Sequence, residues 1–270
     1  MLCLQVKVDY MKKAFVTGAT GFLGLNLIER LLLKEWNITA LYLPGDNLKY
    51  LSQLPVESVA GNVLDYQSLL KAIPEGHIIF HLAGDTTTWH KNAERQYNIN
   101  VRGTINMCRA AIEKKASRFV ITSSSSAFGC HEDPISEQTV SNALTCKINY
   151  HRTKYLSEQE VKKAVEQGLF AVIMNPCNII GPYDPGNWSQ LIKSVYQNDL
   201  PGYPPGIGTF AHVRDVADAH ISAANNGRKG ENYLLGGVEA SFKEVIIEIL
   251  NIIGKDLIFP RNNRHPVKLP

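Results

Sequence analysis

A glycine-rich segment near the start of the chain constrains the fold more than any other feature. The short apolar run Ala14–Thr17 is followed at once by Gly18, Gly21 and Gly24, and an amphipathic stretch covers residues 25–34. This order predicts a strand, a tight turn and a helix. In such a turn the three glycines allow chain reversal, close approach of backbone N–H groups to a pyrophosphate, and tight helix packing. The segment therefore predicts a dinucleotide-binding turn, with a glycine-rich turn that holds no ligand as the alternative.

Apolar runs alternate with helical patterns over the first 175 residues. The runs typical of strands cover residues 38–43, 56–60, 77–82, 118–122 and 169–175. Long helices are expected at residues 93–115 and 147–167. Near-continuous apolar strands between helices are typical of a parallel sheet that is covered on both faces. The predicted fold class is therefore α/β, a doubly wound parallel (Rossmann) sheet whose ligand lies at the carboxyl ends of the strands.

The pattern changes after Pro176. Proline- and glycine-rich loops surround a short helix at residues 188–197, and the remaining elements are helices at 213–225 and 241–253 and a strand at 232–235. We expect residues 11–175 to form the NAD(P)-binding domain, with residues 209–226 returning to it. Residues 176–208 and 227–270 are expected to form a small C-terminal substrate lobe.

Tyr150 and Lys154 stand four residues apart in a predicted helix, so their side chains lie on one face, one turn from each other. A phenol titrates near pH 10 and is a poor acid–base catalyst at neutral pH. A neighbouring ammonium favours the phenolate and is expected to lower the pKa of the phenol. Tyr-x-x-x-Lys arises by chance on many surface helices, but after a dinucleotide-binding turn it indicates a hydride-transfer site.

Charge and cysteine content argue against several other functions. The net charge is 28 − 25 = +3 and the basic residues are scattered, so no nucleic-acid surface is predicted. The five cysteines show no C-x-x-C spacing and no pairing with histidine, so we expect no metal site, and their odd number favours a reducing compartment. No apolar run reaches the roughly 20 residues that span a membrane. Residues 1–13 lack the apolar core of a signal peptide, so the expected location is the cytoplasm, with Met11 as a candidate start.

Eight segments occur in a recognisable order along residues 12–260. They are Thr17–Gly24, Gly61–Asp65, His81–Gly84, Asn100–Asn106, Thr122–Gly129, Tyr150 to Lys154 with Glu158, Pro176–Pro182 and His212–Ala219. Together they resemble the extended short-chain dehydrogenase/reductase family, also named the NAD-dependent epimerase/dehydratase family. Within it, His81–Trp89 and Asn232–Gly237 are most similar to dihydroflavonol-4-reductase-like proteins and hopanoid-associated sugar epimerases.

The resemblance implies roles for individual residues. It makes Tyr150 the catalytic acid–base and Lys154 the residue that lowers the Tyr150 pKa and binds the nicotinamide ribose. It makes Ser124 the hydroxyl that holds the substrate oxygen, with Ser123 and Ser125 as alternatives. The residues expected to contact the cofactor are Gly18, Thr20, Gly21, Phe22, Leu23, Gly24, Asn62, Val63, Leu82, Ala83, Gly84, Asn100, Thr122, Tyr150, Lys154, Pro176 and Ile179.

The chain departs from the family pattern where the adenosine would bind. Asn62 replaces the usual aspartate that bonds the adenine amine, although an asparagine carbonyl oxygen also accepts a hydrogen bond. Tyr42 and Leu43, at the end of the second predicted strand, supply neither the acid typical of NAD sites nor the arginine typical of NADP sites. The absence of this acid and the nearby Lys49 slightly favour NADP as the cofactor, whereas Asp46 would favour NAD if the turn folds back.

The predicted function is reversible hydride transfer at a ketone or secondary alcohol by an NAD(P)-dependent oxidoreductase similar to dihydroflavonol reductases. A nucleotide-sugar epimerase that retains NAD is the alternative, and a non-catalytic, cofactor-binding regulator is a further one. The dehydratase branch is disfavoured, because its Asp-Glu pair is replaced by Ser125 and Ser126.

The expected partner is a small-molecule substrate, with no nucleic acid and no membrane. The aromatic residues of the lobe suit a ring-shaped substrate or, equally, ordinary packing: Tyr183, Trp188, Tyr203 and Phe210. Arg214 either binds a diphosphate or pairs with Asp218. The resemblance also implies a homodimer through the helices at 93–115 and 147–167, and a lobe that is shorter than is usual for the family, or a truncated product.

Overall fold

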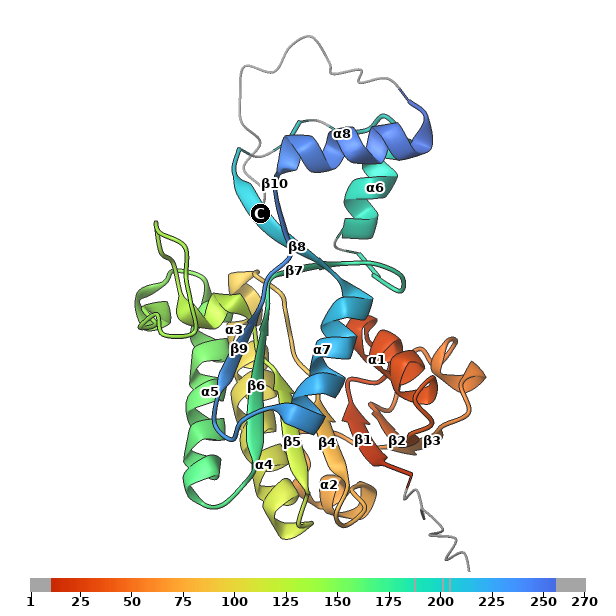
Figure 1. The fold of residues 1–270 in the computed structure, drawn as a ribbon, viewed down its shortest axis with the longest axis vertical. Helices are drawn as coiled ribbons and strands as arrows, with labels where there is room; N and C mark the ends of the chain where they lie inside the picture. Colours follow the sequence, from red (N-terminus) through yellow and green to blue (C-terminus); the bar gives the residue numbers. More distant parts are fainter. Residues whose placement is uncertain (1–10, 187, 201, 204, 256–270) are drawn as a thin grey trace, which may run out of the picture.

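The computed structural model describes residues 11–255 except 187, 201 and 204, and its centre is a sheet of seven parallel strands (Figure 1). The strand order is β3-β2-β1-β4-β5-β6-β9, so the chain winds outward from β1 in both directions. The strands are β1 (Lys13–Thr17), β2 (Asn37–Tyr42), β3 (Glu57–Ala60), β4 (Ile78–His81), β5 (Arg118–Thr122), β6 (Ala171–Pro176) and β9 (Asn232–Leu235). The predicted doubly wound α/β fold is confirmed. The leader before Met11 and the end of the expected lobe, residues 256–270, lie outside the described residues.

Helices cover both faces of this sheet. On one face lie α1 (Phe22–Leu32) and α7 (Val213–Asn226), and on the other lie α2 (Tyr66–Ala72), α4 (Gly103–Glu113) and α5 (Asn149–Glu166). Consecutive strand residues point to opposite faces, so Phe15 packs under α4 while Val16 packs under α1. This two-sided burial explains why the central strands β1, β4, β5 and β6 are almost continuously apolar.

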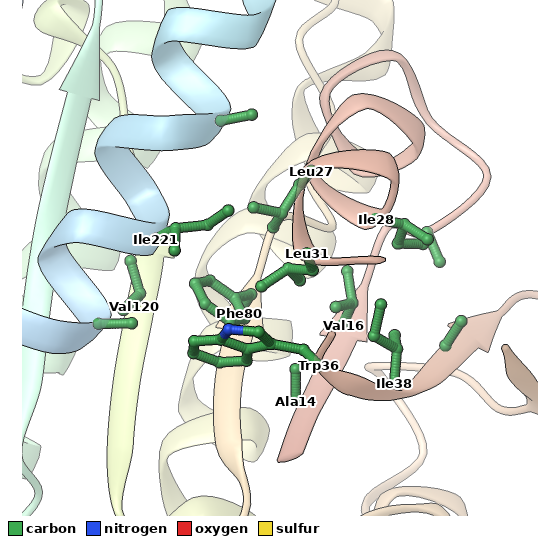
Figure 2. Close-up of a cluster of buried hydrophobic side chains, with 14 of the residues drawn as sticks. Ala14, Val16, Leu27, Ile28, Leu31, Trp36, Ile38, Phe80, Val120 and Ile221 are labelled. Carbon is green, nitrogen blue, oxygen red and sulfur yellow. The ribbon is translucent and has the colours of Figure 1, made fainter. Parts of the chain in front are cut away.

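The core beneath α1 and α7 is well filled (Figure 2). Phe80 of β4 lies at its centre beside Trp36, with 5.9 Å between the ring centroids. Leu27 and Leu31 reach down from α1, and Ile221 approaches from α7. These contacts fix α1, and therefore the glycine-rich turn before it, against the middle of the sheet.

The helix expected at residues 93–115 is interrupted. It consists of α3 (Ala93–Tyr97), a π-helical turn at Asn98–Arg102, and α4. π-turns inside helices occur frequently at functional sites. Here the turn buries Asn100, whose side-chain oxygen accepts from the N–H of Asp85 at 2.7 Å and whose amide donates to the Asp85 carbonyl at 3.0 Å. Asn100 thus positions the loop after β4 and is not a solvated helix residue.

A small lobe lies beyond the carboxyl ends of the main strands, at the top of Figure 1. It contains β7 (Asn178–Ile180), α6 (Trp188–Tyr196), β8 (Ile207–His212), β10 (Val238–Ser241) and α8 (Phe242–Ile253). The sheet order is β10-β8-β7. The strand at 232–235, which the sequence analysis placed in the lobe, instead pairs with β6 in the main sheet as β9. The chain returns there because α7 packs on the main sheet and delivers the following residues to its edge.

Candidate active site

A cavity of about 1300 Å³ opens where the main sheet meets the lobe. Its walls come from the glycine-rich turn, the ends of β4, β5 and β6, the start of α5, and α6 and α8 of the lobe. The predicted residues that line it are Gly18, Gly21, Phe22, Leu23, Gly24, Leu82, Gly84, Thr122, Ser124, Tyr150, Lys154, Pro176 and Ile179. Among the described residues, the predicted contacts that lie outside the lining are Thr20, Asn62, Val63, Ala83 and Asn100.

The glycine-rich turn accepts no side chain at two of its positions. Gly18 has φ +67°, and a Cβ there would lie 2.8 Å from the backbone of Leu82 and Ala83. A Cβ on Gly24 would lie 2.1 Å from the carbonyl oxygen of Gly18. Gly21 is the N-cap of α1 and offers no side-chain acceptor, so the first N–H groups of the helix remain available to a phosphate.

The turn after β2 folds back onto the glycine-rich turn. The carboxylate of Asp46 accepts from the Thr20 hydroxyl at 2.7 Å and from the Leu43 N–H at 3.1 Å. An acid therefore stands at the end of β2, although neither Tyr42 nor Leu43 supplies one. The condition stated for Asp46, that the turn folds back, is therefore met: the acid arrives through the turn and not through the strand.

Asn62 has a local role in the turn between β3 and α2. Its side-chain oxygen accepts from the Leu64 N–H at 2.9 Å, and its backbone N–H donates to Ser68. The oxygen expected to accept from the adenine amine therefore already accepts one hydrogen bond within the turn. The same turn ends at Asp65, which is the N-cap of α2.

Tyr150 and Lys154 project from α5 toward the cavity, with the Lys154 Nζ 5.8 Å from the centroid of the phenol ring. The ammonium donates to the carbonyl oxygen of Thr122 at 3.0 Å. Burial lowers the pKa of Lys154 to about 8, against an opposing effect of the Glu158 carboxylate.

Burial also raises the pKa of Tyr150 to about 12, although the Ser124 hydroxyl lowers it in part and Asp85 raises it further. The predicted lowering of this pKa by Lys154 is therefore not found, and desolvation of the phenolate is the largest effect on it. Tyr150 is partly exposed as a residue, but its hydroxyl is held neutral at pH 7 and is equipped to donate a proton.

The four consecutive serines have different surroundings. Ser123 donates to Oε1 of Glu158 at 2.5 Å, on the side of β5 that faces α5. Ser124 accepts from the Ser126 N–H at 3.2 Å, and its hydroxyl interacts with the phenol of Tyr150. The geometry thus distinguishes Ser124 from Ser123, which the sequence left as alternatives.

The buried carboxylate of Glu158 connects the serine segment to neighbouring strands through hydrogen bonds. Glu158 accepts from Ser123, from the amide of Asn175 at 2.6 Å and from the amide of Asn232 at 3.0 Å. These contacts join α5 to β5, β6 and β9 directly beneath the serines. Asn232 is distant in sequence, and nothing in its neighbourhood pointed to this role.

Two buried histidines brace the strands and do not titrate near neutral pH. Burial lowers the pKa of His81 to about 3 and that of His220 to about 4. His81 bonds the hydroxyls of Thr17 and Thr104, and His220 bonds Thr122 at 2.8 Å. His81 therefore has a structural role at the end of β4.

An apolar wall faces the strand ends from the lobe. The ring of Trp188 stacks on Phe242, with centroids 6.0 Å apart, and meets Phe210 edge-on at 5.0 Å. Trp188 and Phe242 line the cavity. Tyr183 lies elsewhere, because its hydroxyl donates to Glu29 at 2.5 Å, and Tyr203 packs in the core of the lobe.

Charged groups are scarce around the cavity. Among the described residues that line it, Lys154 carries the one positive charge. Arg214 is outside that lining, and Asp218 does not pair with it but accepts two hydrogen bonds from Arg30, at 2.7 and 3.0 Å. In the part of the chain that the structure describes, no helix has the length and apolar character needed to cross a membrane.

Comparison with known proteins gives a consistent result. The model of the NAD dependent epimerase/dehydratase family matches residues 14–236. The "Putative dihydroflavonol 4-reductase" of Synechocystis is 32% identical over 95% of this chain and 76% of that protein. "Sterol demethylase protein B" of Methylococcus capsulatus is 30% identical over 86% of this chain and 71% of that protein.

Solved structures share the same architecture. The crystal structure of gox2253 superposes with a TM-score of 0.85 at 30% identity, over 91% of this chain and 76% of that one. The dTDP-glucose 4,6-dehydratase of Streptomyces venezuelae, solved with NAD and TYD bound, gives a TM-score of 0.80 at 22% identity, over 90% and 82%. The second likeness shows the fold alone.

Proposed function

The chain belongs to the NAD dependent epimerase/dehydratase family, and from this premise we propose that it reversibly reduces a ketone on an uncharged, ring-containing substrate, with NAD(H) as cofactor. The family and its named relatives make the protein an NAD(P)-dependent enzyme of the oxidoreductase and epimerase kind. The substrate class and the preference for NAD are our inferences. The observation that carries them is a cavity with an aromatic wall in which, among the lining residues that the structure describes, Lys154 is the one cation.

The residues at the glycine-rich turn fit a dinucleotide. The space that Gly18 and Gly24 leave open, and the uncapped first turn of α1, form a cradle for the pyrophosphate. Lys154 and Thr122 lie where the nicotinamide ribose would bind, and Pro176 and Ile179 where the ring would rest. When bound, the nicotinamide supplies or accepts the hydride.

The preference for NAD follows from Asp46. Its carboxylate lies at the end of β2, held by Thr20 and by the Leu43 N–H. A carboxylate at this position accepts a hydrogen bond from the ribose 2′-OH and repels a 2′-phosphate. This geometry outweighs the slight lean to NADP that the missing acid at Tyr42 and Leu43 suggested.

The proton chemistry is assigned to three side chains. Tyr150 is neutral at pH 7 and donates its proton to the oxygen of the ketone as negative charge develops there. The Ser124 hydroxyl, beside that phenol, steadies the same oxygen. Lys154 orients the ribose and stabilises the phenolate that remains, until a proton from solvent restores it. In the reverse direction the phenolate takes the proton from the alcohol.

The lining of the cavity favours a neutral substrate over a nucleotide sugar. A diphosphate is normally held by arginine or lysine, and no arginine lies among the described lining residues. The stacked rings of Trp188 and Phe242 offer apolar surface suited to a flat or fused ring. The names of two similar proteins, "Putative dihydroflavonol 4-reductase" and "Sterol demethylase protein B", agree with that chemistry.

The test is consumption of NADH and of NADPH, followed by absorbance, with cyclic ketones in one panel and nucleotide sugars in the other. We expect net oxidation of NADH with ketones, and loss of turnover but normal NADH binding in Tyr150→Phe. Interconversion of a nucleotide sugar without net NADH oxidation would instead identify an epimerase. A protein that binds NADH and turns over neither panel, even at high concentration, would contradict the proposal.

The expected homodimer through residues 93–115 and 147–167 and the cytoplasmic location stay predictions. Light scattering of the purified protein tests the first. Fractionation of cells that express the full chain tests the second.

A further inference from the structure

Two cysteines and a histidine meet outside the cavity, at the start of α5. Cys130 follows the serine-rich turn, Cys146 lies just before α5, and His151 is in its first turn. Their ligating atoms all lie within 4.8 Å of one another. The Cys130 Sγ is 3.0 Å from the Cys146 Sγ and 3.6 Å from the His151 Nδ1. The sequence analysis expected no metal site because it considered only close spacing, whereas the fold closes the long loop between the cysteines.

The backbone of this loop is held in place by contacts that need no ligand. Asn142 accepts from the N–H of Cys130 and donates to its carbonyl oxygen, both at 2.8 Å. Gly129 has φ +95°, and a Cβ there would lie 2.0 Å from the side-chain oxygen of Asn142. A glycine is therefore required at position 129 for the Asn142 side chain to approach the backbone so closely. These contacts hold Cys130 next to Cys146 without a ligand.

We propose that Cys130, Cys146 and His151 bind a zinc ion, with the fourth position open to water. Two thiolates and an imidazole form a ligand set that suits Zn²⁺. With Zn–S near 2.3 Å and Zn–N near 2.0 Å, a tetrahedral site places sulfur and nitrogen about 3.6 Å apart and two sulfurs about 3.8 Å apart. The Cys130–His151 separation already has the first value. The sulfurs need to separate by less than about 1 Å to reach the second value, and Cys130 is exposed.

A disulfide between the same cysteines is the main competing explanation. A bond of about 2.05 Å would require the sulfurs to approach each other by about 1 Å. That bond would also leave the imidazole of His151 without a function, although it lies within reach of both sulfurs. The third ligand is therefore the observation that favours a metal over an oxidised pair.

Zinc at this site would tie the loop at residues 130–146 to the first turn of α5. His151 directly follows Tyr150, so the tie lies beside the phenol without entering the cavity. As each Zn–S bond forms, the thiol releases its proton to solvent, and no electrons are transferred. Because the unfolded chain lacks the assembled site, the binding free energy stabilises the folded protein.

The experiment uses the full chain, reduced and freed of metal by a chelator under anaerobic conditions. Titration with Zn²⁺ against a chromophoric chelator should give one tightly bound ion per chain. Co²⁺ in its place should produce thiolate charge-transfer absorption and the visible bands of a tetrahedral site. Thermal unfolding should shift to higher temperature with zinc. These readouts do not depend on turnover, so they stand or fall separately from the proposed function.

Two variants complete the test. Cys130→Ser changes an exposed side chain and should fold normally, yet loss of a ligand should weaken zinc binding by more than about a hundredfold, since even outer partners contribute tenfold to a hundredfold. Cys108→Ala removes a thiol buried in the core and should keep one zinc per chain. The proposal is overturned if reduced protein binds no stoichiometric zinc, if Cys130→Ser binds it as tightly as the wild type, or if Cys130 and Cys146 are isolated as a disulfide whose reduction gives no zinc binding.

Discussion

Lys154 holds its ammonium inside the fold, and replacement by methionine measures what this burial costs. Burial lowers the pKa from 10.5 to about 8, and the side chain is 7% exposed, so solvent screens little of the effect. A shift of this size corresponds to about 3 kcal/mol against the folded protein at pH 7. The hydrogen bond from the Lys154 ammonium to the Thr122 carbonyl stabilises the folded protein by about 1–2 kcal/mol, because its donor is charged. Lys154→Met should therefore raise the free energy of unfolding by about 1–2 kcal/mol at pH 7.

The difference in unfolding free energy between the wild type and Lys154→Met should depend on pH. Between pH 8 and 10.5 the folded wild type binds fewer protons at Lys154 than the unfolded chain does. Its unfolding free energy therefore rises with pH across this window, relative to the methionine variant. At pH 9.5 the wild type should have regained about 2 kcal/mol, and the advantage of the variant should have disappeared.

Urea unfolding followed by circular dichroism, at pH 7 and pH 9.5, measures both quantities. Lys162→Met is the matched control, because Lys162 is an exposed lysine of the same helix and its removal should give no pH-dependent difference. Turnover of Lys154→Met should fall by about a hundredfold or more. Parallel stability curves for wild type and Lys154→Met between the two pH values would refute the buried-cation argument.

Three further changes test the cofactor and substrate sites. Gly24→Ala should abolish NADH binding in a fluorescence titration, because its Cβ would lie 2.1 Å from the Gly18 carbonyl oxygen; retained affinity would show that the turn can open. Asp46→Asn should improve the affinity for NADPH relative to NADH by about tenfold, or about 1.4 kcal/mol by calorimetry, and an unchanged ratio would contradict the assignment to NAD. Trp188→Ala removes a ring stacked on Phe242 and should raise the KM for a cyclic ketone by about tenfold, which corresponds to about 1.4 kcal/mol of lost contact energy. The affinity for NADH should not change. Equal losses of both affinities would indicate a general disturbance of the lobe.

The parts of the fold that the sequence predicted are those encoded by short-range patterns. All seven strands of the main sheet lie where the sequence predicted a strand, although β9 was assigned to the lobe, and α5 begins within two residues of the expected position. The turn at Gly18 was predictable because its glycine spacing and its positive φ are local features, and the four-residue spacing of Tyr150 and Lys154 brings them together because helix geometry alone determines it.

The remaining features depend on contacts between distant segments. β9 joins the main sheet because α7 carries the chain back to β6, and nothing within residues 232–235 specifies this. Asp46 reaches Thr20 because a loop folds back, and Cys130 reaches His151 because Asn142 closes a long loop. Rules that compare neighbours along the chain do not establish such long-range contacts, so the fold-back of Asp46 could be named only as a condition.

The pKa of Tyr150 also could not be predicted from neighbouring residues in the sequence. Spacing correctly predicted that an ammonium would stand near the phenol, and Coulombic reasoning then predicted a lower pKa. The effect of a charge, however, depends on how much water surrounds the ionised group, and that is a property of the closed fold. Here desolvation dominates, so the pKa of Tyr150 rises to about 12 while that of Lys154 falls to about 8. A neutral phenol beside a buried cation suits proton donation to a ketone in the proposed reaction, and this protonation state follows from the three-dimensional structure and not from the motif.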